Sequence, residues 1–266
     1  MFKKLFEHPL TSGLDPDDSR TTELRRRIIK EKRFLHRIYE EWYGDLIAAI
    51  PAPDACPGRI LELGSGGGFL SDLLPECITS EVFYFKDMDL SLDARALPFA
   101  DGSLRAIIMV DVFHHISNIV DFLREAERTL APGGIVAMWE SWNTPWSRFI
   151  YKTLHPEPFE TEATDWSFTA SGHLSGANGA LPWIVFERDK AIFAKDFPQL
   201  KVEKLRLDYP FSYLASGGVS TWFSAPKMLF SLIRMLERRL SVFEKQMAMF
   251  AFILLRKVDS YQNVTF

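Results

Sequence analysis

The apolar residues of the chain fall into short continuous runs and into stretches of helical spacing, and the two kinds alternate along the sequence. Runs at 59–63, 106–110 and 135–139 predict strands that are buried on both faces, as in a parallel sheet. Apolar residues spaced by threes and fours at 19–50 and 118–130 predict amphipathic helices. This alternation predicts an α/β fold with a doubly wound sheet.

The end of the first predicted strand carries an unusual turn. A carboxylate, Glu62, is followed by glycines at alternate positions, Gly64, Gly66 and Gly68. Glycine tolerates positive φ and lets a ligand lie against the backbone. A dinucleotide fingerprint would need its third glycine at position 69, which is Phe69. The carboxylate would repel a pyrophosphate and attract a positively charged ligand, such as the amino group and sulfonium of S-adenosylmethionine.

This turn resembles motif I of the class I S-adenosylmethionine-dependent methyltransferases, and later stretches resemble the same family in the same order. The similar stretches are Leu-Pro-Phe at 97–99, the string from Asp111 to Ile116, and the Leu-x-Pro-Gly-Gly turn at 130–134. They are typical of the methyltransferase type 11-like subgroup. The resemblance implies a seven-stranded Rossmann-like sheet, S-adenosylmethionine as cofactor and methyl transfer as the activity.

The cofactor site that this resemblance implies lies at the ends of the first four strands. Glu81, at the end of a strand at 77–81, would accept hydrogen bonds from both ribose hydroxyls, and Asp87 is the alternative acid. Asp93 would accept from the adenine amino group, and the backbone amide of Ala94 would donate to the ring. The cofactor-binding candidates are Glu62, Gly64, Ser65, Gly66, Gly68, Glu81, Asp93, Ala94, Asp111 and Val112.

Candidate residues for the acceptor side follow the fourth and fifth strands. A hydroxyl acceptor must lose a proton, which a neutral histidine can take. His115, and then His114, are the candidate bases because the end of the fourth strand faces the methyl group in the family that the chain resembles. His155 and His173, from the predicted cap, are the remaining candidate bases. The candidate acceptor contacts are Trp142, Trp146, His173 and Asn178, with core packing and an ordinary surface loop as the alternatives.

Composition narrows the function further. The net charge of -4 argues against nucleic acid as the main partner. The two cysteines, Cys56 and Cys77, lack metal-type spacing, so we expect a reducing compartment, no disulfide framework and no metal site. The longest apolar run, 247–255, is far shorter than the roughly 20 residues of a membrane span. We therefore expect a soluble cytoplasmic protein; its oligomeric state stays open.

Three regions are expected along the chain. Residues 1–55 form a helical lid segment, 56–145 the S-adenosylmethionine-binding core, and 146–266 a substrate cap with the last two strands. The basic helix in the first region is either a solvated face or a lid over the ligand.

The sixth and seventh strands are predicted at 201–208 and 249–258. The resembled family usually joins these two strands tightly, whereas here a helix at 224–243 intervenes. This helix is either a cap packed on the core or a basic amphipathic helix resting on an anionic membrane.

The predicted function is methyl transfer to a small-molecule acceptor. A saccharide or lipid-linked intermediate and O-methylation are favoured, because residues 173–179 are similar to the caps of methyltransferases associated with polysaccharide gene sets. The alternatives are a noncatalytic S-adenosylmethionine-binding partner protein and an NAD-dependent oxidoreductase. Phe69 and Glu62 count against the latter.

Overall fold

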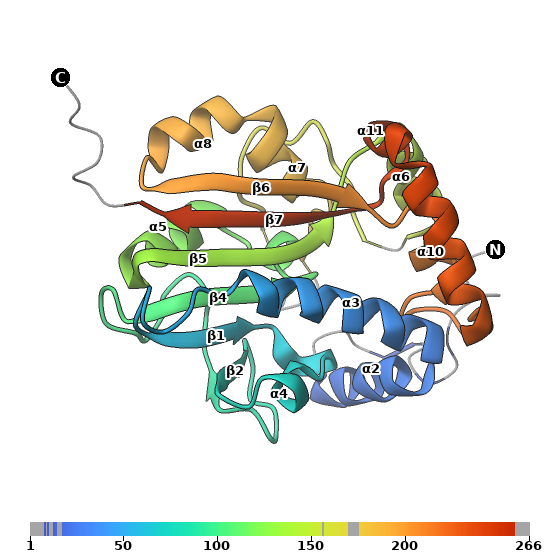
Figure 1. The fold of residues 1–266 in the computed structure, drawn as a ribbon, viewed down its shortest axis with the longest axis horizontal. Helices are drawn as coiled ribbons and strands as arrows, with labels where there is room; N and C mark the ends of the chain where they lie inside the picture. Colours follow the sequence, from blue (N-terminus) through green and yellow to red (C-terminus); the bar gives the residue numbers. More distant parts are fainter. Residues whose placement is uncertain are drawn as a thin grey trace.

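The structure is a computed structural model that describes residues 8, 10, 13–14, 18–155, 157–169 and 176–258. A seven-stranded sheet runs through the middle of the molecule, with helices around it (Figure 1). Its spatial order is β3-β2-β1-β4-β5-β7-β6. The strands are β1 Arg59–Leu63, β2 Cys77–Glu81, β3 Leu90–Ser91, β4 Leu104–Val110, β5 Leu130–Ser141, β6 Leu200–Asp208 and β7 Phe250–Lys257. The predicted seven-stranded α/β sheet is confirmed.

Strand directions explain where a ligand can bind. β1 to β5 pair in parallel, whereas β7 is antiparallel to both β5 and β6. The chain runs from β1 outward to β2 and β3, then returns to place β4 on the other side of β1. In doubly wound sheets a crevice opens at such a reversal, at the carboxyl ends of the strands. Here those ends are Leu63 and Val110.

The helices flank the sheet and fill its edges. They are α2 Ser19–Glu31, α3 Arg33–Ala49, α4 Leu70–Leu73, α5 Ile119–Thr129, α6 Pro145–Leu154, α7 Leu181–Trp183, α8 Lys190–Asp196, α9 Ser212–Ser216, α10 Phe230–Arg239 and α11 Glu244–Met247. Short 3-10 turns cover Ser65–Gly67 and Phe113–His115, and a π-helical turn covers Ile184–Arg188. Within the part of the chain that the structure describes, none of the helices combines the length and apolar composition of a membrane span.

The helix predicted at 19–50 is two helices that meet at Lys32. Lys32 leaves helical geometry, with ψ at 87°. Its ammonium donates hydrogen bonds to the carbonyl oxygens of Gly218, at 2.7 Å, and Thr221, at 2.8 Å. Burial lowers the pKa of Lys32 to about 8. Helical periodicity continues across this break, so no local pattern predicts a bend that a distant loop stabilises.

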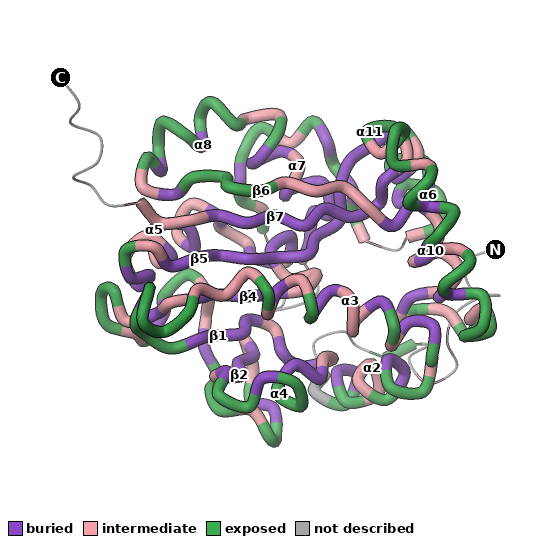
Figure 2. Tube along the Cα trace, in the orientation of Figure 1, coloured by how far each residue is buried: buried purple, intermediate pink, exposed green. Residues whose placement is uncertain are grey.

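An aromatic cluster fixes α3 to the sheet. Trp42 of α3 stacks on Trp139 of β5, with ring centroids 5.9 Å apart, and packs edge-on against Tyr209 at 5.7 Å. Phe250 of β7 closes the cluster at 5.0 Å from Trp42. All four side chains are buried. Figure 2 shows the middle strands as buried and much of α10 as exposed.

A buried ion network attaches α10 to the rest of the molecule. The guanidinium of Arg234 pairs with Glu41 of α3 at 3.0 Å, with Asp208 of β6 at 2.8 Å and with Glu237 at 2.6 Å. It also lies 3.9 Å from the ring centroid of Tyr209, as a cation–π contact. One cation thus connects three elements that are far apart in the sequence.

Replacing Arg234 by alanine should lower the free energy of unfolding by about 3–5 kcal/mol, because the buried Glu237 and the half-buried Asp208 would lose their counter-charge. Arg239→Ala is the matched control on the exposed side of the same helix and should change stability by no more than about 0.5 kcal/mol. Urea denaturation followed by circular dichroism measures both. Equal losses in the two variants would show that the network contributes nothing specific.

Candidate active site

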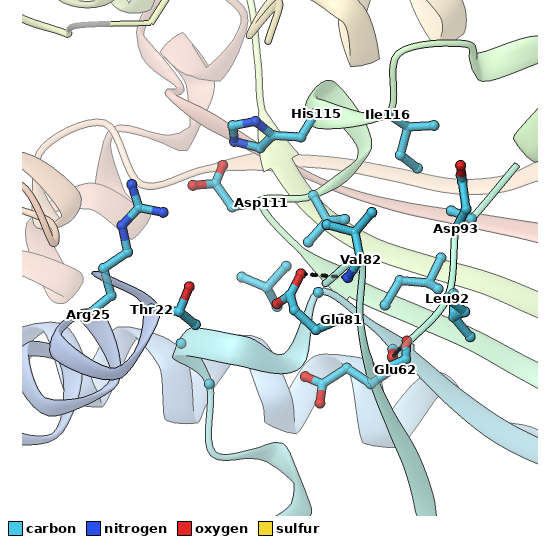
Figure 3. A pocket seen from close by; sticks show the side chains of 18 of the residues that line it. Thr22, Arg25, Glu62, Glu81, Val82, Leu92, Asp93, Asp111, His115 and Ile116 are labelled. Carbon is cyan, nitrogen blue, oxygen red and sulfur yellow. Dashed lines mark hydrogen bonds between the residues drawn. The ribbon is translucent and has the colours of Figure 1, made fainter. Parts of the chain in front are cut away.

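A cavity of about 670 Å³ opens at the carboxyl ends of β1 and β4, where the sheet order reverses (Figure 3). Strand ends and the Gly-rich turn form one side of it, and α2 and α3 form another. Its lining includes Thr22, Arg25, Ile29, Tyr39, Tyr43, Glu62, Gly64, Gly67, Gly68, Glu81, Leu92, Asp93, Ala94, Asp111, Val112, His115, Ile116, Glu157 and Phe168. Most of the predicted cofactor-binding candidates therefore border one space.

The Gly-rich turn exposes backbone to this cavity. Gly64 has φ at 66°, and a Cβ there would collide with the side chain of Val112. Only glycine meets both conditions without strain. Two candidates of the turn lie behind the lining: Ser65 accepts a hydrogen bond from the Ser80 backbone amide at 3.2 Å, and the Gly66 amide donates to a carboxylate at 3.1 Å. These two residues hold the turn in shape.

Two buried carboxylates border the turn. Glu62, at the end of β1, is 4% exposed, and burial raises its pKa to about 7. Glu81, at the end of β2, accepts hydrogen bonds from the amides of Gly66 and Val82, at 3.1 and 3.0 Å. Burial raises the pKa of Glu81 as well. The alternative acid, Asp87, is exposed and does not line the cavity.

The far edge of this half of the cavity combines a carboxylate with an apolar wall. Asp93 accepts hydrogen bonds from the backbone amide of Arg95 at 2.9 Å and from its guanidinium at 2.6 Å. Ala94, Ile116 and Phe168 lie beside it in the lining. A flat heteroaromatic ring with one amino group suits such a slot.

The N-terminal helices close the cavity from the side of α2. Arg26 donates from Nε to the carbonyl oxygen of Gly66 at 3.1 Å, which ties α2 to the Gly-rich turn. Thr22 is 3% exposed, and its hydroxyl has no hydrogen-bond partner among the described residues. Figure 3 shows Thr22 and Arg25 facing the cavity from α2. A buried hydroxyl without a partner is costly, so a ligand in the cavity would offer Thr22 a partner.

The other half of the cavity begins at Asp111, directly after β4. Its φ is 59°, a left-handed conformation that residues other than glycine rarely adopt. Its side chain stays 37% exposed toward the cavity. Burial and the nearby carboxylates of Glu140 and Glu157 hold the pKa of Asp111 above its ordinary range, although His114 opposes this shift.

Glu140 of β5 organises the turn that follows. Its Oε1 accepts the backbone amides of Val112 and Phe113, each at 2.7 Å, and its Oε2 accepts Nδ1 of His114 at 2.7 Å. Glu140 is fully buried. The carboxylate therefore fixes both the backbone of the turn and the ring of His114.

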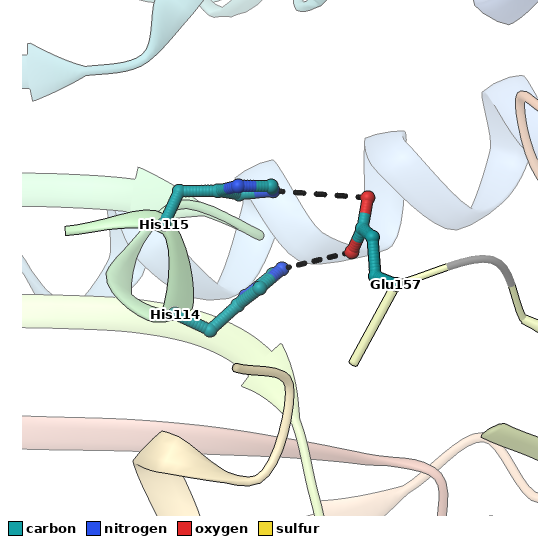
Figure 4. Close-up of side chains that lie close together, drawn as sticks. All are labelled: His114, His115 and Glu157. Atoms are coloured by element: carbon teal, nitrogen blue, oxygen red, sulfur yellow. Dashed lines mark ion pairs between the residues drawn. The ribbon is translucent and has the colours of Figure 1, made fainter. Parts of the chain in front are cut away.

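Glu157 faces both histidines of the turn (Figure 4). Its carboxylate lies 3.5 Å from Nε2 of His114 and 4.0 Å from Nε2 of His115. Burial opposes the charge of His114, but its contacts with Glu140 and Glu157 hold the pKa of His114 well above its usual range. Burial would likewise raise the pKa of Glu157, yet the histidines keep it far below its ordinary value.

His115 has the opposite character. Its Nδ1 lies 3.2 Å from the carbonyl oxygen of Gly176, which can only accept a hydrogen bond. The ring proton therefore belongs on Nδ1, and Nε2 carries the lone pair. Burial, together with the charge of His114, lowers the pKa of His115 to about 4. At neutral pH His115 is therefore uncharged, and its Nε2 can accept a hydrogen bond or a proton in the cavity that it lines.

Side-chain atoms here are also close enough for a metal ion. Those of His114, His115 and Glu157 lie within 4.8 Å of one another, and so do those of Asp111, His114 and Glu140. An imidazolium at His114 between two carboxylates accounts for these distances without a metal ion. The expectation that the protein holds no metal stays a prediction.

Three of the predicted acceptor contacts lie away from the cavity, and the fourth is outside the described residues. Trp142 is buried in the core, and Trp146 donates from Nε1 to the carbonyl oxygen of Pro210 at 2.9 Å. Asn178 accepts the backbone amides of Glu160 and Ala180 and so shapes a loop. None of these three lines the cavity. His173 lies outside the described residues.

Several lining residues were not anticipated from the sequence. Tyr39, Tyr43 and Glu157 line the cavity and were not among the predicted site residues. His155 lies by a small neighbouring cavity, with Nδ1 3.9 Å from the Glu157 carboxylate. No local pattern marks Glu157, because its partners come from a turn some forty residues earlier in the chain.

Comparison with known proteins agrees with this geometry. Residues 61–138 match the family model described as a methyltransferase domain. A comparison with curated proteins finds no match. A crystal structure from Thermotoga maritima, described as an S-adenosylmethionine-dependent methyltransferase and possible histamine N-methyltransferase, is similar at 17% identity and a TM-score of 0.53. The similarity covers 90% of this chain and 97% of that one.

A second similar structure is the geranyl diphosphate C-methyltransferase of Streptomyces coelicolor A3(2), at 14% identity and a TM-score of 0.49, over 95% of this chain and 89% of that one. Residues 61–138 therefore form a methyltransferase domain, and the structure from Thermotoga maritima has the same fold. The cofactor of this domain is S-adenosylmethionine. The predicted family, enzyme class and cofactor are confirmed; the roles of individual residues stay predictions.

The two adjacent histidines should titrate in opposite senses. As the pH falls from 8 to 5, His114 should stay an imidazolium throughout and His115 should stay neutral with its proton on Nδ1, taking up a second proton only near pH 4. Proton–nitrogen correlation spectra of the imidazole rings distinguish these states, with His114→Gln and His115→Gln assigning the signals. A His115 that titrates near its ordinary pKa of about 6.5 would contradict the arrangement around Gly176.

Proposed function

We propose that this enzyme transfers the methyl group of S-adenosylmethionine to a hydroxyl of a small-molecule acceptor. The observation that carries the proposal is the single cavity that reaches from the Gly-rich turn to a neutral histidine, His115. One end offers backbone and carboxylates for the cofactor. The other offers a proton acceptor beside Asp111 and Glu157.

The cofactor half has a polar group for each part of the ligand. Glu62 would attract the amino group, because a carboxylate 4% exposed interacts strongly with a cation in a low-dielectric site. Glu81 would accept from the ribose hydroxyls, and Asp93 with the amide of Ala94 would bind the adenine edge. Thr22, whose buried hydroxyl lacks a partner among the described residues, would contribute a further contact.

Methyl transfer from a sulfonium is an in-line displacement: the acceptor oxygen attacks the methyl carbon, and the bond to sulfur breaks. The enzyme contributes mainly by aligning the three atoms and by excluding water. His115 would accept the hydroxyl proton on Nε2, and the adjacent Glu157 carboxylate would stabilise the imidazolium that forms.

The polar groups at this end suit an acceptor with several hydroxyls. Asp111 and Glu157 can each accept a hydrogen bond from a hydroxyl other than the one methylated. Arg25, on the opposite wall, can donate to an oxygen or pair with an anionic group. We therefore favour a saccharide, free or lipid-linked, as the acceptor.

Calorimetric titration with S-adenosylhomocysteine tests the cofactor half. Glu81→Gln should weaken binding by about 10- to 100-fold, because a charge-assisted hydrogen bond to the ribose is lost. Asp87→Asn is the matched control: a nearby, exposed acid that does not line the cavity. Equal losses in the two variants, or none in either, would overturn the assignment of Glu81.

The acceptor half is tested with methyl-labelled S-adenosylmethionine and a panel of saccharides and lipid-linked saccharides. With any acceptor that is methylated on oxygen, His115→Gln should lower kcat by about 10²- to 10⁴-fold, as expected for loss of a general base. Affinity for S-adenosylhomocysteine should not change, which shows that the site is intact. Undiminished kcat, or labelling confined to nitrogen acceptors, would contradict the role of His115.

A further inference from the structure

Helix α10 packs with its polar side inward. The side chains that it buries are Phe230, Arg234 and Glu237, and the last two belong to the ion network with α3 and β6. Its leucines and methionine lie outside: Leu232, Met235 and Leu236 are 44–48% exposed. A surface helix of a globular protein normally turns its apolar side toward the core. The helix thus packs on the rest of the molecule through Phe230 and the ion pairs of Arg234, and these leucines lie on its outer side.

Large apolar side chains continue on both sides of α10. Met228, just before the helix, is 84% exposed, and Val242 and Phe243, just after it, are 78% and 52% exposed. Monomeric soluble proteins rarely expose so many neighbouring apolar residues without a partner for them. We call the exposed surface of residues 227–245 the apolar–basic face.

The charges on this face have one sign. Lys227, Arg238, Arg239 and Lys245 are exposed. Of the two acids in the same stretch, Glu237 is buried against Arg234 and Glu244 is half-buried. The chain as a whole carries a net charge of -4, so the positive charge here is local. Long basic side chains around exposed leucines suit an anionic surface with an apolar interior.

We infer that the apolar–basic face rests on an anionic membrane surface. Such interfacial binding needs leucine and aromatic side chains that reach the acyl boundary and basic side chains at the level of the headgroups. The ion pairs of Arg234 already hold α10 in that orientation, so no rearrangement has to precede docking. Figure 1 shows α10 at one edge of the molecule, where a flat surface can reach it.

The chain segment that precedes this face borders the cavity. Val219 lines the cavity, and the neighbouring carbonyl oxygens of Gly218 and Thr221 hold Lys32 between α2 and α3. In a protein docked through residues 227–245, this short segment would connect the docked face to the cavity. If the proposed acceptor half is correct, a lipid-linked saccharide could be methylated without leaving the membrane.

Vesicle flotation tests this inference with the full-length protein. The protein should float with vesicles of phosphatidylcholine and phosphatidylglycerol in equal parts, and not with phosphatidylcholine alone. Added salt should weaken the binding because it screens the basic side chains. The Leu232→Ser, Leu236→Ser double variant should lower partitioning by at least about tenfold. Arg238→Gln with Arg239→Gln should remove the preference for anionic lipid.

The matched control is Ile192→Ser with Lys195→Gln on α8, an exposed apolar residue and a nearby exposed basic residue on another face. It should float like the unchanged protein. No flotation, or equal loss in control and test variants, would overturn the inference. A dimer in sedimentation that the leucine variants dissociate would overturn it too, since the face would then join two copies. Calorimetry with S-adenosylhomocysteine, which these variants should leave unchanged, separates this failure from failure of the proposed cofactor site.

Discussion

The proposed acceptor half of the site depends on one buried carboxylate, that of Glu140. A carboxylate removed from water is stable only when hydrogen bonds or a cation satisfy it, and Glu140 obtains two amides and an imidazole from the turn after β4. These hydrogen bonds fix the conformation of the turn and thereby the left-handed backbone of Asp111. The charged His114 attracts Glu157 from a distant segment, and burial together with the charge of His114 keeps His115 neutral.

The cavity as a whole carries more negative than positive groups. Glu62, Glu81, Asp93, Asp111 and Glu157 border it, against Arg25, Arg95 and the nearby charge of His114. Such a balance favours a cofactor with a positive sulfonium over the neutral thioether that remains after transfer. The same electrostatics that attract the reactant therefore assist release of the spent cofactor. Burial strengthens this effect, since water screens charges less inside a closed cavity.

The sheet and the residues that meet at its carboxyl edge were predictable from the sequence, because both follow from local rules. Apolar runs identify the strands, and parallel strands bring their carboxyl ends to one edge, so Glu62, Glu81 and Asp111 had to meet there. Glu157 could not be predicted, since its position depends on the charge of a histidine far away in the sequence. Trp142 and Trp146 were chosen for composition alone, and composition does not distinguish a pocket wall from a core. The bend at Lys32 could not be predicted for a similar reason, because the loop that stabilises it is nearly two hundred residues away in the sequence.

The orientation of helix α10 could not be predicted from the sequence either. Periodicity reveals the two sides of a helix but not which side faces inward. Its inner side is held by Arg234, whose three carboxylate partners come from α3, β6 and α10 itself. A buried ion network is seldom more stabilising than apolar packing of similar volume. The leucines of the same helix could have supplied such packing. Stability of the isolated protein therefore does not explain the orientation. An orientation that exposes leucines and pairs an arginine inside is the one expected where the outer side of the helix has an apolar environment of its own.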